Sequence, residues 1–126
     1  MSSRSLNKVQ LIGNLTRDPE LKYTQSGSAF CRFGLATNRN WRTATGEEKE
    51  ETEFHSIVAW DKLAELCATL LVEGNKIYVE GRLHTKSWTN GNGETHVKSE
   101  IVIDEIILLH NRKMEIKTAA DQGGTS

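Results

Sequence analysis

The sequence predicts an all-β chain interrupted by a single helix, the element order of a five-stranded Greek-key barrel. Three observations support this prediction. Most apolar residues alternate with polar ones at a period of two, an apolar pattern of helical period occurs once, and turn-forming residues separate the segments. The length of 126 residues suits one domain with a modest core.

The first three predicted strands form a meander. The segment LNKVQLIGNL alternates apolar and polar residues until RDP turns the chain. A second strand, within SAFCRFGLATNRNW, follows a turn at Ser26 and Gly27. A turn at Thr45 and Gly46 then closes a hairpin to the third strand, residues 52–60.

A helix and two further strands complete the pattern. From Leu63 onward, apolar residues recur at i, i+3, i+4, i+7 and i+8, which predicts a helix over residues 61–73 with Asp61 as N-cap and Gly74 as its stop. A fourth strand follows, a glycine-rich tip at residues 90–93 turns the chain, and HVKSEIVIDEIILL returns as the fifth. This is the order of an OB-fold with one helix between strands three and four.

The domain boundaries follow the hydrophobicity. We expect the OB-fold domain to span residues 1–110 and a flexible C-terminal tail to span residues 111–126, where hydrophobicity is lost. The N-terminus has no apolar signal segment, and no run of about 18 apolar residues occurs, so we expect a soluble, cytoplasmic protein. Cys31 and Cys67 each lie on an apolar face without a CxxC motif, which indicates buried thiols in a reducing compartment.

The charge is balanced overall but segregated along the chain. The formal net charge is −1, so composition alone does not indicate a nucleic-acid binder. Five of the 17 acidic residues crowd one hairpin, at Glu47, Glu48, Glu50, Glu51 and Glu53, while Arg82, Lys86 and Lys98 lie along later strands. Any binding of an anionic partner must therefore depend on local potential.

Aromatic residues occur where a core pattern does not expect them. In the predicted fourth strand, one face carries Ile77, Val79, Leu83 and Thr85, while the other carries Tyr78, Arg82, His84, Lys86 and Trp88. In the third strand, Phe54 and Trp60 share a parity with polar residues. Flat rings beside cations suit unpaired nucleic acid, whose bases can stack on the rings while its phosphates meet the cations.

Six segments of the sequence closely resemble the bacterial single-stranded DNA-binding protein family. They are LNKVQLIGNLTRDPELKYTQSG, LATNRNWR, TGEEKEETEFH, KLAEL, GNKIYVEGRLHTKSWTNGNGE and DEIILL, and the resemblance covers nearly all of residues 6–109. It implies a homotetramer that binds and wraps single-stranded DNA without sequence specificity and protects it during replication, recombination and repair. It also implies a bacterial, nucleoid-associated protein that uses no cofactor or metal and performs no chemistry.

The resemblance also assigns residues. It places base-stacking positions, expected together on the outer surface, at Trp41, Phe54, Trp60 and Trp88; position 54 is often Trp in relatives. Cations beside these positions are candidates for phosphate contact, namely Arg4, Arg32, Arg42, Lys62, His84 and Lys86. The ordinary alternatives are a partly buried tryptophan and a solvated surface charge.

A second group of residues is expected at subunit contacts. Glu80 is a poor neighbour for phosphate, and a pair with Lys8 across a subunit contact removes that objection. In the family the corresponding surface helps join two dimers into a tetramer, which implies that role for Lys8, Gln10, Tyr78, Glu80 and Arg82, while the histidine that matches His55 lies at a subunit contact. For His55, the expected role is a structural hydrogen bond at such a contact.

The family typically ends in a flexible linker with an acidic tip that recruits replication and repair proteins. This sequence stops at ADQGGTS, so the resemblance predicts weak recruitment of such partners, whether the chain is truncated or naturally lacks the tip.

Two other classes of function stay open. An enzyme could use His55, Asp61, His84, His96 and the glutamate-rich hairpin for a metal site or a general base, but no HExxH, CxxC or nucleophile motif occurs. An OB-fold interaction module for RNA or a replication-restart complex could share the barrel while remaining a monomer or dimer. Measuring the oligomeric mass, and the competition between single-stranded DNA and RNA, would distinguish that module from a tetrameric single-stranded DNA-binding protein.

Overall fold

The computed structural model of this chain describes residues 4–110, and the predicted tail at residues 111–126 lies outside the described residues. The elements, in chain order, are β1 (Val9–Leu15), β2 (Glu20–Tyr23), β3 (Ala29–Arg42), β4 (Glu48–Trp60), α1 (Asp61–Leu70), β5 (Lys76–Thr89) and β6 (Thr95–His110). Five of the strands are those predicted. The short strand β2, which pairs with β3, was not predicted.

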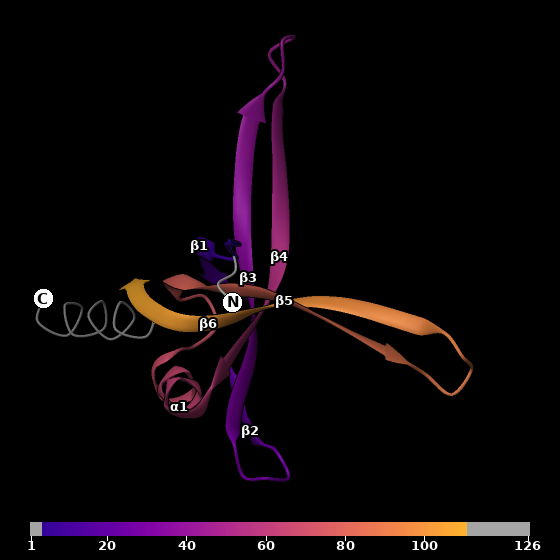
Figure 1. The fold of residues 1–126 in the computed structure, drawn as a ribbon. Helices are drawn as coiled ribbons and strands as arrows, with labels where there is room; N and C mark the ends of the chain where they lie inside the picture. The colour runs from indigo at the N-terminus through magenta and orange to yellow at the C-terminus, as the bar shows by residue number, and fades with distance from the viewer. Residues whose placement is uncertain (1–3, 111–126) are drawn as a thin grey trace, which may run out of the picture.

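The strands close into the expected OB-fold barrel. The sheet order is β1-β5-β6-β4-β3-β2, and an additional pairing of β1 with β3 closes the five long strands on themselves. The pairing of β4 with β6 is parallel and short, from Ile57 opposite Ile101 to Val58 opposite Val102. Two hairpins extend well beyond the barrel, one made by β3 and β4 and one by β5 and β6 (Figure 1). We call them the β3–β4 arm and the β5–β6 arm.

The barrel interior is filled by alternate residues of the strands, as the period of two predicts. Phe33, Leu35, Ile57, Ile77 and Val79 are almost completely buried there. Helix α1 adds a second layer, and its buried residues are Ala64 and Cys67. Both cysteines are buried free thiols, which confirms that part of the prediction.

Helix α1 differs from the prediction at both ends. Trp60 occupies the N-cap without a side-chain cap bond, and Asp61 is already the first helical residue, with a φ of 56°. Strand β4 runs directly into the helix with no loop, so one residue must absorb the change of direction, and Asp tolerates the left-handed region better than most residues. The helix ends at Leu70, and Gly74, with a φ of 90°, turns the later segment into β5. No helix within residues 4–110 is long and apolar enough to cross a membrane.

The pairing of β5 with β6 contains an irregularity near the middle of β5. The register against β6 shifts between Glu80 and Gly81. A Cβ at position 81 would collide with the backbone carbonyl of Val102, so only glycine fits where the strands approach this closely. Leu83, which the period of two places on the same face as Ile77 and Val79, is 47% exposed.

Candidate functional site

The four predicted stacking positions are all exposed. The exposed fractions are 36% for Trp41, 72% for Phe54, 39% for Trp60 and 47% for Trp88. None of these rings belongs to the core, although Trp41 and Trp60 are partly covered by their neighbours. They lie on three strands: Trp41 on β3, Phe54 and Trp60 on β4, and Trp88 on β5.

The rings do not form a single surface. Strands β3 and β4 pair without interruption, with Trp41 opposite Lys49 and Ala36 opposite Phe54. Directly opposed residues share a face, and successive residues alternate between faces. Because five positions separate Lys49 from Phe54, Trp41 and Phe54 lie on opposite faces of the β3–β4 arm, although all four rings lie on the outer surface, as expected.

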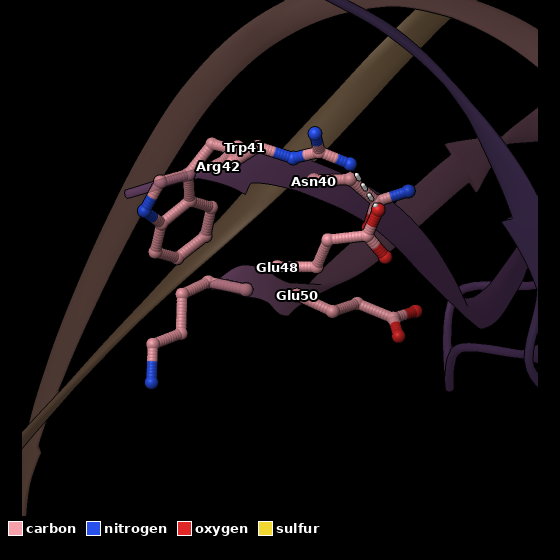
Figure 2. A pocket seen from close by; sticks show the side chains of 6 residues that line it. Asn40, Trp41, Arg42, Glu48 and Glu50 are labelled. Carbon is pink, nitrogen blue, oxygen red and sulfur yellow. Dashed lines mark hydrogen bonds and ion pairs between the residues drawn. The ribbon is translucent and has the colours of Figure 1, made fainter. Parts of the chain in front are cut away.

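Trp41 lies in a hollow of the β3–β4 arm lined by Asn40, Trp41, Arg42, Glu48, Lys49 and Glu50 (Figure 2). The guanidinium of Arg39, which the sequence reasoning missed, lies 4.7 Å from the centre of the Trp41 ring, in cation–π contact. Arg42 reaches Glu48, with Nη2 and Oε1 2.8 Å apart. The charge of Arg42 is therefore already matched by a carboxylate, although both side chains are well exposed.

Trp60 is joined to β3 by a second aromatic ring that the sequence reasoning missed. The rings of Phe30 and Trp60 lie 5.4 Å apart between centroids and are inclined by 39°. The guanidinium of Arg32 lies 5.2 Å from the centre of the Phe30 ring. Trp60, Phe30 and Arg32 thus form a continuous row across β4 and β3. The register shows this proximity, since Phe30 and Trp60 are directly paired.

Arg32 and Lys86, two of the predicted phosphate-contacting cations, meet at one buried carboxylate. Arg32 Nε donates to Glu100 Oε2 at 3.1 Å, and Lys86 Nζ lies 3.1 Å from Glu100 Oε1. Burial acts to raise the pKa of Glu100, but the hydrogen bond from Lys86 and the charges of Arg32 and Lys86 together hold it below its usual range. Glu100 is therefore ionised at neutral pH.

These side chains border an open hollow, which we call the cationic hollow, lined by Arg32, Lys86, Ser87, Trp88 and Lys98. Lys98 is directly opposite Lys86 in the β5–β6 arm and was also absent from the predicted set. The hollow therefore combines three cations with one exposed indole.

The other predicted cations are more scattered. Arg4 and Lys62 are exposed, the second in the first turn of α1, two residues after Trp60. His84 is exposed on β5 and directly opposite Glu100. The structure thus gathers Arg32 and Lys86 in the cationic hollow and leaves Arg42 on a separate arm.

The residues predicted for a subunit interface form a network on β1 and β5. Lys8 Nζ lies 3.3 Å from Glu80 Oε1, and the Tyr78 hydroxyl donates to the same oxygen at 2.8 Å. Gln10 Nε2 donates to the Tyr78 hydroxyl at 3.0 Å and to Glu80 at 3.2 Å. The expectation that Lys8 and Glu80 pair across a subunit contact is wrong, because β1 and β5 are neighbours in one chain and Gln10 is directly opposite Glu80.

The network also affects acidity. The Tyr78 hydroxyl and Lys8 hold the pKa of Glu80 below its usual range.

The other two residues predicted for a subunit interface lie outside this network. Arg82 is exposed on β5. His55 bonds Thr37 instead, with Nε2 and Oγ1 2.9 Å apart, which confirms the structural hydrogen bond expected for it.

The residues weighed for an enzyme do not assemble into a metal site. Among residues 4–110, no group of three or more His, Cys, Asp and Glu side chains has the geometry to hold an ion. His55 lies on β4, His84 on β5 and His96 on β6, while Asp61 begins α1.

The chain was compared with known proteins. The model of the single-strand binding protein family matches residues 6–109. Among solved structures, the chain is similar to a Plasmodium falciparum SSB in complex with single-stranded DNA, at 35% identity and a TM-score of 0.78, covering 86% of this chain and 99% of that one. It is also similar to a deletion variant of the single-stranded DNA-binding protein from Thermus aquaticus, at 34% identity and a TM-score of 0.75, covering 85% of this chain and about half, 52%, of that one.

Proposed function

The chain belongs to the single-strand binding protein family, and from this premise we propose that it binds and wraps single-stranded DNA without sequence specificity, protecting it during replication, recombination and repair. The match over residues 6–109 carries the proposal, because it includes all of the barrel and both arms except the last residue of β6. We further propose that the protein acts on DNA of the bacterial nucleoid.

The proposed mechanism combines stacking with phosphate contact. Bases stack on Trp41, Phe54, Trp60 and Trp88, each stack contributing about 1–3 kcal/mol whatever the base, because every base has a π-face. Exposed cations meet the phosphates and release counterions. Two stacking positions lie on opposite faces of the β3–β4 arm, so a strand that uses both must pass around the arm. This arrangement supports wrapping over binding in a single straight groove.

A homotetramer is part of the proposal. The network of Lys8, Gln10, Tyr78 and Glu80 is the proposed contact between dimers, with Arg82 beside it, and His55 is proposed at a further contact. The bonds within this network satisfy its polar groups inside one chain, so a partner can pack over it without leaving a charge unpaired.

Tryptophan emission tests the function directly. If bases stack on the three indoles, saturating oligo(dT) strongly quenches the emission while duplex DNA does not. The affinity should fall with salt at a log–log slope of about −0.7 for each phosphate contact. Binding without quenching would remove stacking from the mechanism. Equal or tighter binding of single-stranded RNA would favour the RNA module instead.

Native mass measurement tests the assembly. We expect tetramers in the free protein and a complex of one tetramer with one long oligo(dT). A monomer or dimer that binds the same oligonucleotide would overturn the proposed tetramer and leave the DNA-binding function standing.

A further inference from the structure

Glu100 is a buried carboxylate on a surface that is expected to meet phosphates. It lies on β6 with a side-chain exposure of 4%, and its two oxygens are engaged by Arg32 and Lys86, each at 3.1 Å. A buried carboxylate is costly unless it is paired and hydrogen-bonded, and here it is both. The presence of a buried carboxylate among the expected phosphate contacts therefore needs a functional explanation.

The partners of Glu100 come from different parts of the barrel. Arg32 belongs to β3 and Lys86 to β5, while Lys98 is directly opposite Lys86. Without an anion between them, the like charges of Arg32 and Lys86 would separate into solvent. The carboxylate holds both cations in fixed positions and neutralises one of three positive charges, which leaves a formal charge of +2 beside the cationic hollow.

The cations keep donors for a ligand. Arg32 uses Nε for Glu100, so its two terminal Nη nitrogens have hydrogens left to donate, and Lys86 uses one of its three. Glu100 itself accepts hydrogen bonds only and lies beneath the surface, so it meets no phosphate directly.

The cationic hollow has the size and chemistry for one nucleotide. Its volume of about 450 Å³ lies within the ~300–1,000 Å³ range of small-ligand sites. The exposed indole of Trp88 offers a stacking surface beside the three cations. From the hollow, the Arg32, Phe30 and Trp60 row leads to the next indole, so the following nucleotides have a path over β3.

We infer that the cationic hollow is a subsite for one nucleotide of a single strand, and that Glu100 is a positioning residue that arranges Arg32 and Lys86 for its phosphate. The inference rests on the proposed function. It predicts coupling: the contribution of Lys86 to binding depends on the charge of Glu100.

A double-mutant cycle tests the coupling. Lys86→Ala is measured in the native background and beside Glu100→Gln, with an oligo(dT) of fixed length and a salt series. In the native background we expect about tenfold weaker binding and a salt slope smaller in magnitude by about 0.7. Beside Glu100→Gln, where Lys86 is no longer held, the same change should weaken binding by about threefold or less.

The control is Asp104→Asn, which removes one negative charge from an exposed position on the same strand. In that background Lys86→Ala should keep its full effect. An equal effect of Lys86→Ala in the native and Glu100→Gln backgrounds would reduce Glu100 to a structural residue and overturn the inference. If the native chain neither binds nor is quenched by oligo(dT), the proposed function itself fails.

A second cycle leaves Glu100 unchanged and decides the matter if Glu100→Gln does not fold. Arg32→Ala and Lys86→Ala are made singly and together. Two cations held on one phosphate should be coupled, so the double variant should lose less affinity than the two single losses combined. Losses that combine without coupling would show that the two side chains contact separate phosphates, and the inference would be wrong.

Discussion

Trp88 and His96 stack their rings across the β5–β6 arm, with centroids 5.6 Å apart and planes inclined by 25°. The two residues are directly opposed in the register. Asn90 orients the imidazole, since its Nδ2 lies 3.0 Å from His96 Nε2. One face of the indole is therefore covered by a residue of the same arm, and the other face is the one left for a base.

His96→Ala should loosen Trp88 and weaken the binding of single-stranded DNA. An aromatic pair contributes about 0.5–1.5 kcal/mol, which corresponds to a loss of about 2- to 13-fold. The emission of Trp88 in the free protein should also shift to longer wavelength as water reaches the uncovered face. Val97→Ala, at the neighbouring exposed position, is the control and should change neither property. Unchanged binding by both variants would show that the contact of His96 with the Trp88 ring does not contribute to DNA binding.

Phe54→Ala should weaken binding by about 1–3 kcal/mol, the contribution of one stacked base. Because the ring is 72% exposed, the melting temperature should change little. Phe54→Trp is the matched control: it keeps a stacking face, so it should bind at least as tightly and increase the emission lost on binding. If Phe54→Ala binds oligo(dT) like the native chain, position 54 is not a stacking site.

Glu80→Lys should lower the assembly state. The change places a cation beside Lys8 and removes the acceptor shared by Tyr78 and Lys8. Native mass spectrometry should show dimers where the native chain forms tetramers. Glu65→Lys makes the same change of charge on the exposed surface of α1 and should leave the tetramer intact. Full tetramers of the Glu80 variant at low micromolar concentration would indicate that the interface lies elsewhere.

The lowered pKa of Glu80 adds a pH dependence with a definite sign. A carboxylate whose pKa is lower in the folded protein stabilises it above the unfolded pKa, and the contribution is lost as the pH falls through the folded pKa. We therefore expect the contribution of Glu80 to folding stability to hold from pH 7 to pH 5 and to be lost only below the usual carboxyl range. Chemical unfolding of the native chain and of Glu80→Gln along a pH series checks this, and a stability difference between the two that has already disappeared at pH 6 would contradict it.

Gly81→Ala should destabilise the barrel. The added methyl group would meet the backbone of Val102 and Ile103, which has no side-chain freedom to move aside, at a cost of about 1–3 kcal/mol. Thermal unfolding followed by circular dichroism should show a lower melting temperature by several degrees. Gly91→Ala, at the tip of the β5–β6 arm, points into open space and should be neutral. Similar melting temperatures for both variants would disprove the close approach at position 81.

The two thiols should be unreactive in the folded protein. Burial raises the pKa of Cys67 to about 12, with a further contribution from Cys31, and burial followed by the charge of Glu20 raises the pKa of Cys31. Thiolate is the reactive form, so alkylation at pH 8 should be very slow until the chain is unfolded in guanidinium, when both cysteines should react. Mass analysis of the labelled protein measures this. Rapid labelling without denaturant would show that α1 opens readily.

The order of the elements and much of the candidate surface could be predicted from sequence patterns alone. Alternation and helical spacing record which residues are buried, so the five long strands, the helix and the two buried cysteines were predicted from pattern. The glycines at the hairpin turns were also predicted from the sequence. Gly46 and Gly93 have φ values of 88° and 82°, which L-residues with side chains rarely adopt. The exposure of Phe54, Trp60 and Trp88 was expected from their parity with polar residues, and the resemblance to the family added Trp41.

Which side chains are in contact depends on strand pairing, which the sequence patterns do not reveal. In the sequence, nothing distinguishes Glu100 from the other acidic residues of the strands. It is buried against Arg32, which is 68 residues away in the sequence, and Lys86 of the neighbouring strand β5. The split of Trp41 and Phe54 between two faces required the register of β3 and β4, since a shift of one residue exchanges the faces. Lys8 and Glu80 pair within one chain because β1 lies beside β5. Periodicity is a local property of the chain, whereas strand pairing joins distant segments through barrel closure, so the pattern predicts what is buried and the closed barrel decides what is in contact.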